Sequence, residues 1–414
     1  MYDINSIGMS AKTASYELMN ITSDLKSKAL NAIADELIKN TDEILKENEK
    51  DLELLLKNKE KASFYDRLKL TKERIEQIAE GVRQVDKLPD PVGEITEMIK
   101  RPNGLMIGRK RVPLGVIGII YEARPNVTVD AAALCFKTSN ACVLRGGSEA
   151  INSNKVLVKI MKQALKSVGA PQDAISLIED TSRDVAAKMM KLNEYIDVLI
   201  PRGGAGLINT VVNTATVPVI ETGTGNCHIY VEKSADINMA ASIVENAKTT
   251  RVSVCNAAES LLVDEEIADV ALPAIYEKLK EHNVEVFGCE KTKEILKDIK
   301  NATETDYSTE YLDYKISVKV VSGIDEAIKH INRYSTKHSE SIITSNYEAS
   351  QRFLNEIDSA AVYVNASTRF TDGFEFGFGA EIGISTQKLH ARGPLGLREL
   401  TTSKYIIYGN GQIR

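Results

Sequence analysis

Apolar residues in the first part of the chain recur with the spacing of one helix face. Between Ser23 and Lys87 they stand three or four positions apart, with charged residues between them. The positions are Leu25, Ala29, Leu30, Ile33, Leu37, Leu68, Ile75, Ile78 and Val82. This period predicts amphipathic helices that pack one face against a core. The same segment carries no motif with a catalytic signal.

From Gly115 onward the pattern changes to short apolar runs separated by helical segments. The runs are 115–120, 141–144, 175–178, 196–200 and 216–220, and the helical segments are 149–168 and 182–192. Strands that alternate with helices are typical of right-handed βαβ units and of a parallel sheet covered on both faces. The alternation predicts a domain of the dinucleotide-binding class.

A second α/β region starts near Ile229. Its predicted strands are 229–232, 260–263, 318–321, 341–344 and 361–364, and its predicted helices are 237–248, the segments up to Lys300, and one from Asp325. A short apolar loop that contains Cys255 lies between the first helix and the second strand. We expect this region to form a catalytic domain.

Two further strand segments lie outside these domains. Residues 98–112 have the pattern of a hairpin with Asn103 and Gly104 at its turn, and residues 403–408 form an apolar strand near the C-terminus. A projecting hairpin and a terminal strand can pair in an oligomeric sheet. We therefore expect a homo-oligomer, either a dimer or a tetramer.

Together the segments predict an α/β protein with a Rossmann-type cofactor domain, an α/β catalytic domain and a small oligomerisation element. A chain of 414 residues has the length for several domains of about 150 residues. The predicted bounds are 1–97 and 110–228 for the N-terminal helices and dinucleotide-binding domain, 229–363 for the catalytic domain, 98–109 and 385–414 for the oligomerisation elements, and 364–384 for a return segment to the cofactor domain.

Composition removes several classes of protein. The formal charge is −6 and the Lys and Arg residues are spread along the chain, so no basic stripe points to nucleic acid. No apolar run reaches the roughly 20 residues of a membrane span, and the start of the chain lacks the basic and apolar stretches of a secretory signal. We expect a cytoplasmic protein without a membrane partner.

The cysteines and histidines form no metal-binding or disulfide pattern. They are widely spaced, without a Cys-x-x-Cys pair and without two histidines at helical i, i+4 spacing. They are Cys135, Cys142, Cys227, Cys255, Cys289, His228, His282, His330, His338 and His390. We expect reduced thiols and no metal.

Two Gly-rich turns follow predicted strands and begin predicted helices. Free backbone N–H groups at a helix start can bind a phosphate, and a guanidinium beside them can hold a phosphate or ribose of a cofactor. The full Gly-x-Gly-x-x-Gly fingerprint is absent, so a simple tight turn and a surface ion pair remain as alternatives. The residues are Arg145, Gly146, Gly147 and Ser148 in the first turn, and Gly203 and Gly204 in the second.

Cys255 is the candidate nucleophile, and it lies 34 positions after Glu221. A thiolate attacks an acyl carbon to give a thioester, from which hydride chemistry can proceed. Asn126, in the turn after the strand at 115–120, can direct its side-chain amide at a developing oxyanion. Buried core filler is the alternative for the cysteine, and a loop cap is the alternative for the asparagine.

These residues together resemble the aldehyde dehydrogenase superfamily. The shared features are a Pro-x-Gly-Val-x-Gly strand followed by an Asn turn, a strand that ends in a basic residue, a Gly-rich turn, and the spacing of Glu221 and Cys255. Residues 121–127, 361–373 and 385–394, with positions between Val321 and Glu340, resemble one branch of it, the reductases that act on L-glutamyl 5-phosphate. The likeness covers essentially the whole chain.

The resemblance implies a reaction, a cofactor and a partner. L-Glutamyl 5-phosphate would be reduced by NADPH to L-glutamate 5-semialdehyde and phosphate, with NADP⁺ as the other product, through a thioester on Cys255. This reaction is the second step of proline biosynthesis from glutamate. A glutamate 5-kinase is the candidate protein partner, because it would supply the labile acyl phosphate.

The resemblance also implies roles for single residues. Asn126 and the Cys255 backbone N–H would form the oxyanion hole, and Arg145 would suit the 2′-phosphate of NADPH. Glu310 would hold the nicotinamide ribose. Glu221 matches the general base of oxidative relatives, but phosphate is the leaving group here, so we expect it only to gate or orient. The basic candidates for the two anionic ends of the substrate are Arg124, Arg251, Arg369 and His390.

Two other functions stay open at this point. A non-phosphorylating semialdehyde dehydrogenase would oxidise its substrate to an acid, with Glu221 as the hydrolytic base. A non-catalytic nucleotide-binding scaffold would belong to another class, and the presence of Cys255, Asn126 and Glu310 speaks against it. A requirement for phosphate separates the phosphorylating reaction from the hydrolytic one.

Overall fold

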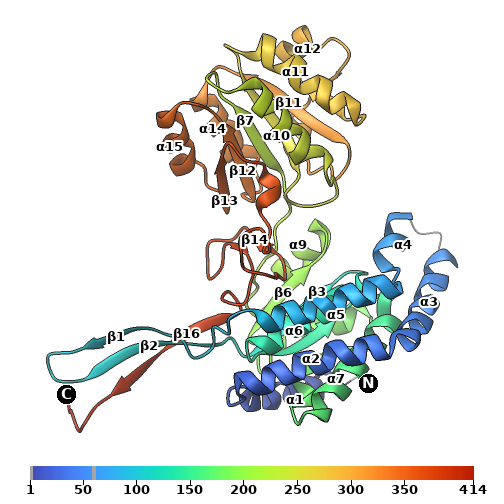
Figure 1. The fold of residues 1–414 in the computed structure, drawn as a ribbon, viewed down its shortest axis with the longest axis vertical. Coiled ribbons are helices and arrows are strands. Elements are labelled where there is room, and N and C mark those ends of the chain that lie inside the picture. The colour runs from blue at the N-terminus through green and yellow to red at the C-terminus, as the bar shows by residue number, and fades with distance from the viewer. Residues whose placement is uncertain (1–2, 58–61) are drawn as a thin grey trace. The chain divides into compact units, whose positions relative to one another are not determined.

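The computed structural model describes residues 3–57 and 62–414 and divides the chain into two compact α/β units (Figure 1). The first unit comprises Met1–Thr222, Gly377–Gly383 and Leu395–Arg414, and the second comprises Gly223–Phe376 and Ile384–Pro394. These bounds differ from the predicted ones. The first boundary follows residue 222 rather than 228, and much of the predicted return segment belongs to the second unit. Within the predicted N-terminal helical region, residues 58–61 lie outside the described residues.

The first unit begins with amphipathic helices, as the spacing of apolar residues predicts. Leu30, Ile33 and Leu37 are completely buried on one face of the second helix, which packs against α5 and α7. Thr22 and Thr71 accept hydrogen bonds from backbone N–H groups in the first turns of α2 and α5, and so cap them. The helices are α1 Ile4–Leu18, α2 Ser23–Lys39, α3 Thr41–Lys57, α4 Ala62–Leu68 and α5 Lys72–Lys87.

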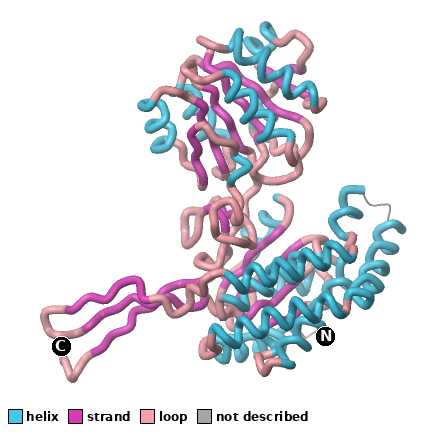
Figure 2. The backbone as a smooth tube through the Cα atoms, viewed as in Figure 1, coloured by secondary structure: helices cyan, strands magenta, loops and turns pink. Residues whose placement is uncertain are grey.

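The sheet of the first unit is parallel and has the strand order β5-β4-β3-β6. Helices lie along both sides of it (Figure 2), and every residue of β3 is buried, as expected of a strand covered on both faces. The strands are β3 Val116–Tyr121, β4 Ala141–Arg145, β5 Ile175–Leu177 and β6 Val198–Arg202; the helices between and after them are α6 Pro125–Lys137, α7 Ile151–Ser167, α8 Arg183–Met189 and α9 Ala205–Thr214, with the short 3₁₀ turns Ser148–Ala150 and Gln172–Ala174.

Two predictions for this unit are wrong in detail. Residues 216–220 form only an isolated bridge, Val219 to Leu199, because Pro218 has no N–H to donate to a ladder. Asn126 lies in the first turn of α6 rather than in a turn between elements. Pro125 is the first residue of that helix, where its fixed φ favours helix and its missing N–H costs nothing.

The predicted hairpin consists of β1 Ile95–Lys100 and β2 Met106–Pro113, which pair antiparallel. The C-terminal strand β16 Thr401–Tyr408 pairs with the other edge of β2, so the order is β1-β2-β16 within one chain (Figure 1). All six residues of β1 are exposed, including Ile95 and Ile99. An oligomeric sheet remains a prediction.

The second unit contains a seven-stranded parallel sheet of order β10-β9-β11-β8-β7-β12-β13. Its strands are β7 Cys227–Val231, β8 Ala258–Asp264, β9 Glu285–Gly288, β10 Lys300–Asn301, β11 Lys315–Val321, β12 Ser339–Ile343 and β13 Ala361–Val364. Its helices are α10 Ile237–Thr249, α11 Ala268–Glu281, α12 Glu290–Ile295, α13 Glu304–Tyr307, α14 Ile324–Tyr334 and α15 Tyr347–Glu356. The 3₁₀ turn η3 Thr368–Phe370 and the short pair β14 Ile384–Ser385 and β15 Gly393–Pro394 complete the unit.

Alternate residues of these strands enter two separate cores. Leu261 and Val263 pack with the apolar faces of α10 and α11, while Leu262 packs with α14 and α15. Helices therefore cover both faces of the sheet. The strand β9, within a region predicted to be helical, was missed because its four residues are too few to show a period of two.

Candidate active site

The first unit places all of the predicted cofactor residues except Glu310 along one edge of its sheet. The chain runs from β3 outward to β4 and β5 and then returns to β6 on the other side of β3, so the order of strands reverses between β3 and β6. In open α/β sheets, ligands bind at the carboxyl ends of the strands beside such a reversal. Arg145 ends β4 and Gly146 to Ser148 follow it, Gly203 and Gly204 follow β6, and Arg124 and Asn126 follow β3.

Arg145 is the half-buried last residue of β4, and its Nη2 donates to the carbonyl oxygen of Thr181. Burial lowers the pKa of its guanidinium, and the negative charges of Glu149 and Asp180 act in the opposite direction. Its Nε is buried and has no hydrogen-bond partner among the described residues. A guanidinium in this state suits an anion that supplies the missing acceptor.

The two glycines after Arg145 are in close contact with neighbouring side chains. A Cβ at Gly146 would lie 2.2 Å from the Asn154 Nδ2, and one at Gly147 would lie 2.4 Å from the Glu149 Oε2. At Gly146 the buried Asn154 leaves no room for a side chain, whereas at Gly147 the Glu149 carboxylate could move aside. This cradle and the unpartnered Arg145 Nε fit a phosphate group of a dinucleotide.

The second Gly-rich turn is held by Glu122, a residue that sequence reasoning missed. The Gly204 N–H donates to the Glu122 Oε1 at 3.0 Å, and a Cβ at Gly203 would lie 2.7 Å from the Glu122 carboxyl carbon. The start of α9 is therefore capped by a carboxylate of the protein itself. A cofactor phosphate at this position would have to replace that contact.

Asn126 is exposed in the first turn of α6, and its Nδ2 donates to Asp130 Oδ2 at 3.0 Å. An amide nitrogen carries two hydrogens, so this contact leaves one for another acceptor. Burial raises the pKa of Asp130 to about 6, despite the hydrogen bond from Asn126. Glu221 is half-buried in the last stretch of the first unit, between Ile220, which donates to Leu199, and Thr222, which donates to Pro201.

In the second unit, Cys255 lies in the loop between α10 and β8 and is half-buried. Its carbonyl oxygen accepts a hydrogen bond from Cys227 Sγ at 3.1 Å. Burial raises the pKa of Cys227 well above its usual value, so Cys227 remains a thiol and a donor. A Cβ at Gly225 would lie 1.4 Å from the same carbonyl oxygen. The Cys255 backbone is thus fixed from the side of residues 225–227.

The residue after Cys255 is held by the η3 segment. Asn256 is buried, and its Nδ2 donates to the carbonyl oxygens of Thr371 at 2.9 Å and Arg369 at 3.2 Å. Thr368 Oγ1 donates to the Asn256 carbonyl oxygen at 2.7 Å. Asn256 was missed because its hydrogen-bond partners lie far along the sequence. Arg369, Thr371 and Thr368 follow it by 113, 115 and 112 positions.

Two of the predicted substrate-binding arginines lie near Cys255 in this unit. The Arg369 Nη1 donates to Asn256 Oδ1, and its Nε is buried with no hydrogen-bond partner among the described residues. Burial lowers the pKa of Arg369, the nearby charge of Arg251 lowers it further, and Cys255 raises it. Arg251 itself is exposed. A pair of like charges beside a thiol favours an anionic ligand.

Glu310 also acts on the Cys255 loop through Gly225. Its Oε1 accepts the Gly225 N–H at 2.6 Å, and burial raises the pKa of its carboxyl group. His390, the remaining predicted substrate residue, is exposed between β14 and β15 with a left-handed φ of 65°. Arg124 precedes α6 in the first unit.

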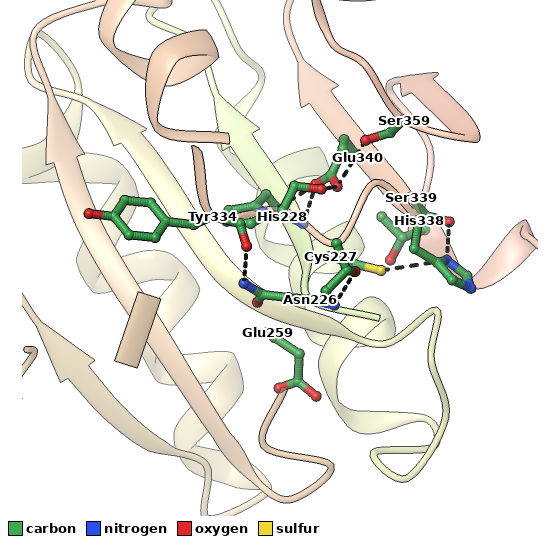
Figure 3. A network of polar contacts seen from close by, with 12 residues as sticks. Asn226, Cys227, His228, Glu259, Tyr334, His338, Ser339, Glu340 and Ser359 are labelled. Carbon is green, nitrogen blue, oxygen red and sulfur yellow. Dashed lines mark hydrogen bonds and ion pairs between the residues drawn. The ribbon is translucent and has the colours of Figure 1, made fainter. Parts of the chain in front are cut away.

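Residues of the segment between Val321 and Glu340 make polar contacts with Asn226, Cys227 and His228 (Figure 3). Asn226 Nδ2 donates to the Tyr334 carbonyl oxygen at 2.9 Å, and the His228 N–H donates to Glu340 Oε2 at 2.6 Å. These contacts give residues 334 and 340 a supporting role for the start of β7 at Cys227.

Other features of the described chain bear on the class of protein. Across residues 3–57 and 62–414, no cluster of three or more His, Cys, Asp or Glu side chains could hold a metal ion. None of the helices within those ranges has both the length and the apolar character required to span a bilayer. Cys135, Cys142 and Cys227 are buried, Cys255 and Cys289 are half-buried, and none of these five cysteines forms a disulfide.

Comparison with known proteins identifies the family. The family model described as "Aldehyde dehydrogenase family" matches residues 2–293. The gamma-glutamyl phosphate reductase of Clostridium perfringens strain 13 is 64% identical over 407 residues, which cover 98% of each chain. The enzyme of that name from Caldicellulosiruptor bescii is 61% identical over 418 residues and all of both chains. The crystal structure of gamma-glutamyl phosphate reductase from Thermotoga maritima is 52% identical and superimposes with a TM-score of 0.98 over all of both chains.

The match confirms the predicted fold class and the prediction of an oxidoreductase. The names of these relatives describe an enzyme and not a non-catalytic scaffold. The chain belongs to the aldehyde dehydrogenase family and, within it, to the gamma-glutamyl phosphate reductases.

Proposed function

We propose that the chain reduces L-glutamyl 5-phosphate with NADPH to L-glutamate 5-semialdehyde and phosphate, as the second step of proline biosynthesis. The names of full-length relatives at 61% and 64% identity support the substrate. The observation that carries the chemistry is the Cys255 loop. Its backbone is fixed by Gly225 and Cys227, and its thiol lies within electrostatic reach of Arg369.

In the first step, the thiolate of Cys255 attacks the acyl carbon of the substrate. A C–S bond forms, the bond from that carbon to the phosphate oxygen breaks, and inorganic phosphate leaves with the bonding electrons. Arg369 and Arg251 stabilise the negative charge of the thiolate and of the departing phosphate. The Cys255 N–H and the Asn126 amide would bind the oxyanion of the intervening tetrahedral state.

NADPH, when bound, supplies the hydride that reduces the thioester to a thiohemiacetal. The chain's own part is then to release the aldehyde: the oxyanion of the thiohemiacetal re-forms the carbonyl, the C–S bond breaks, and its electrons regenerate the thiolate of Cys255. Phosphate has already departed, so no hydrolytic water is needed. Glu221 would therefore gate or orient rather than act as a base.

The residues present fit a dinucleotide with a 2′-phosphate. The buried, unpartnered Nε of Arg145 and the cradle at Gly146, Gly147 and Ser148 would hold the adenosine end, beside Gly203 and Gly204. Glu310 would hold the nicotinamide ribose. Arg124 and His390, with the two arginines near Cys255, would bind the anionic ends of the substrate. A homo-oligomer and a glutamate 5-kinase partner belong to the same proposal.

The reverse reaction tests the proposal. Purified protein is mixed with glutamate 5-semialdehyde and NADP⁺, and NADPH formation is followed with and without inorganic phosphate. Multiple turnovers that require phosphate support the phosphorylating reaction. Multiple turnovers in phosphate-free buffer would instead establish the hydrolytic dehydrogenase and overturn the proposal.

A further inference from the structure

A buried ion pair closes the base of the loop that carries Cys255. Lys248 is the second-last residue of α10, and Glu259 is the second residue of β8. Lys248 Nζ lies 2.6 Å from Glu259 Oε2, and both side chains are completely inaccessible to solvent. The loop from Thr250 to Ala257 therefore starts and ends at one fixed contact.

The same carboxylate holds a second segment. Glu259 Oε1 accepts the backbone N–H of Leu312 at 3.1 Å. Leu312 has a left-handed φ of 51°, which a leucine seldom adopts without support from its surroundings. Leu312 stands two residues after Glu310, so the contact fixes the path of the segment that supplies Glu310.

Glu310 in turn reaches the nucleophile. Its Oε1 accepts the Gly225 N–H at 2.6 Å, and Gly225 lies directly against the Cys255 carbonyl. Glu310 thus joins residues 309–313 to residues 223–226, and Glu259 joins residues 309–313 to the end of the Cys255 loop. His228 and Glu340, another fully buried ion pair among the described residues of this unit, contact neither the Cys255 loop nor the Glu310 segment.

An ion pair is a costly way to join two buried elements. Desolvation of both charges opposes their attraction, and a packed apolar pair in the same place is often as stable or more so. Burial raises the pKa of Glu259 to about 7 and lowers the pKa of Lys248, which is the expected mark of that desolvation. Glu259 therefore differs from an apolar side chain in the same place by its hydrogen bond to the Leu312 N–H rather than by added stability.

We propose that Glu259 is a positioning residue for catalysis: through its hydrogen bond to the Leu312 N–H it holds the Glu310 segment against the start of β8, where the Cys255 loop ends, while Lys248 neutralises its buried charge. Neither side chain contacts the reacting atoms. The inference rests on the proposed role of Cys255 as nucleophile. It predicts that removal of the link to Leu312 lowers kcat more than it changes either KM.

Two double variants separate the link from the charge. Lys248→Met/Glu259→Leu removes the ion pair and the acceptor for Leu312. Lys248→Met/Glu259→Gln also removes the charges but keeps an amide oxygen that can accept the Leu312 N–H. The matched control is Lys291→Met/Glu265→Gln, because Lys291 and Glu265 form an exposed ion pair of the same 2.6 Å length in the same unit.

We expect the Leu variant to lose about 10-fold or more in kcat, with each KM within about threefold of wild type. The Gln variant should keep kcat within about threefold, as should the control. A folded Leu variant with wild-type kcat would overturn the proposal. So would a Gln variant that loses as much kcat as the Leu variant, and this comparison remains decisive if the Leu variant fails to fold.

Amide hydrogen exchange provides a readout that does not need the substrate. In the Leu variant, peptides that cover 250–257 and 309–313 should exchange at least about 10-fold faster than in wild type, and peptides from α11 should not change. Unchanged exchange in both segments would contradict the proposal even if the wild-type protein does not act on L-glutamyl 5-phosphate. Loss of the proposed function and loss of the positioning role are therefore distinguishable.

Discussion

The backbone of Gly225 lies so close to Cys255 that a Cβ built on it would fall 1.4 Å from the Cys255 carbonyl oxygen. No flexible side-chain end can move aside here, because the obstructing atom belongs to the backbone of the nucleophile. The conformation of the Cys255 loop therefore depends on the absence of a side chain at residue 225.

Gly225→Ala tests this contact. The methyl group must displace the Cys255 carbonyl, and a displacement of about 1 Å at a reacting group costs on the order of 100-fold in rate. We expect kcat to fall by that amount in steady-state assays. The control is Gly81→Ala in α5, where nothing lies within 4 Å of the added Cβ. Wild-type kcat in Gly225→Ala would show that the loop tolerates the shift.

Two variants of Glu310 separate the effect of its hydrogen bond from the Gly225 N–H from the effect of its negative charge. Glu310→Gln keeps an oxygen at the end of the side chain, whereas Glu310→Ala removes it. We expect the Gln variant to keep kcat within about 10-fold and the Ala variant to lose about 100-fold. The measurement is kcat and the KM for NADPH in both proteins. Equal losses would assign the effect to the charge and not to the contact with Gly225.

Arg145 carries the proposed preference for NADPH. Removal of one charge-assisted hydrogen bond to a phosphate costs about 1.5–3 kcal/mol, so Arg145→Leu should raise the KM for NADPH by at least about 10-fold. The KM for NADH should stay the same, because NADH has no 2′-phosphate. Lys155→Met, which removes an exposed cation from the same unit, is the control. An equal rise for both nucleotides would refute the assignment.

The pH dependence of stability should contain a contribution from His330. Its ring is buried beside Tyr307 and Tyr334, with centroids 5.0 Å and 4.6 Å away. Burial lowers its pKa from 6.5 to about 3. Folding therefore favours the neutral form of His330. Its contribution to stability is fully present above pH 6.5, the pKa of the unfolded state, and is lost as the pH falls from 6.5 toward 3.

The expected loss from this one group is about 1 kcal/mol between pH 7.5 and pH 5.5. Denaturant unfolding at both pH values, in wild type and in His330→Phe, measures it. The variant removes the titrating group but keeps an aromatic ring between the two tyrosines. Stability that declines equally in both proteins would show that His330 does not contribute.

Much of the fold could be predicted from the chain because its signals are local. The period of 3.6 in the N-terminal helices and the alternation of strands and helices after Gly115 are both read within windows of a few residues. The hairpin was also predicted from local turn residues, at 98–112, and its strands span 95–113 in the structure. The prediction of a strand at 216–220 was wrong because Pro218 interrupts the hydrogen-bond ladder. Asn126 was taken for a turn residue, although Pro125 begins a helix that contains it.

For the site, the sequence predicted which side chains take part but not the contacts that hold them in place. The sequence singles out Cys255, Glu310 and Arg369 by resemblance, and the second unit places Arg369 near Cys255 and connects Glu310 to its loop through Gly225. The hydrogen bonds that hold these residues in place join segments that are far apart along the chain. His228 and Glu340 are 112 positions apart, and Asn256 and Thr371 are 115 apart. No local pattern encodes such pairs, because each depends on how the strands are ordered in the sheet.

The central claim is that Cys255 forms the thioester. Glutamate 5-semialdehyde and NADP⁺ are mixed with the protein in phosphate-free buffer, and the product is followed by NADPH absorbance and by mass spectrometry of the peptide that contains Cys255. We expect a burst limited to one NADPH per active site and a glutamyl group on Cys255, released when phosphate is added, with neither seen in Cys255→Ala. A glutamyl group on another residue, or a burst that survives in Cys255→Ala, would contradict the account.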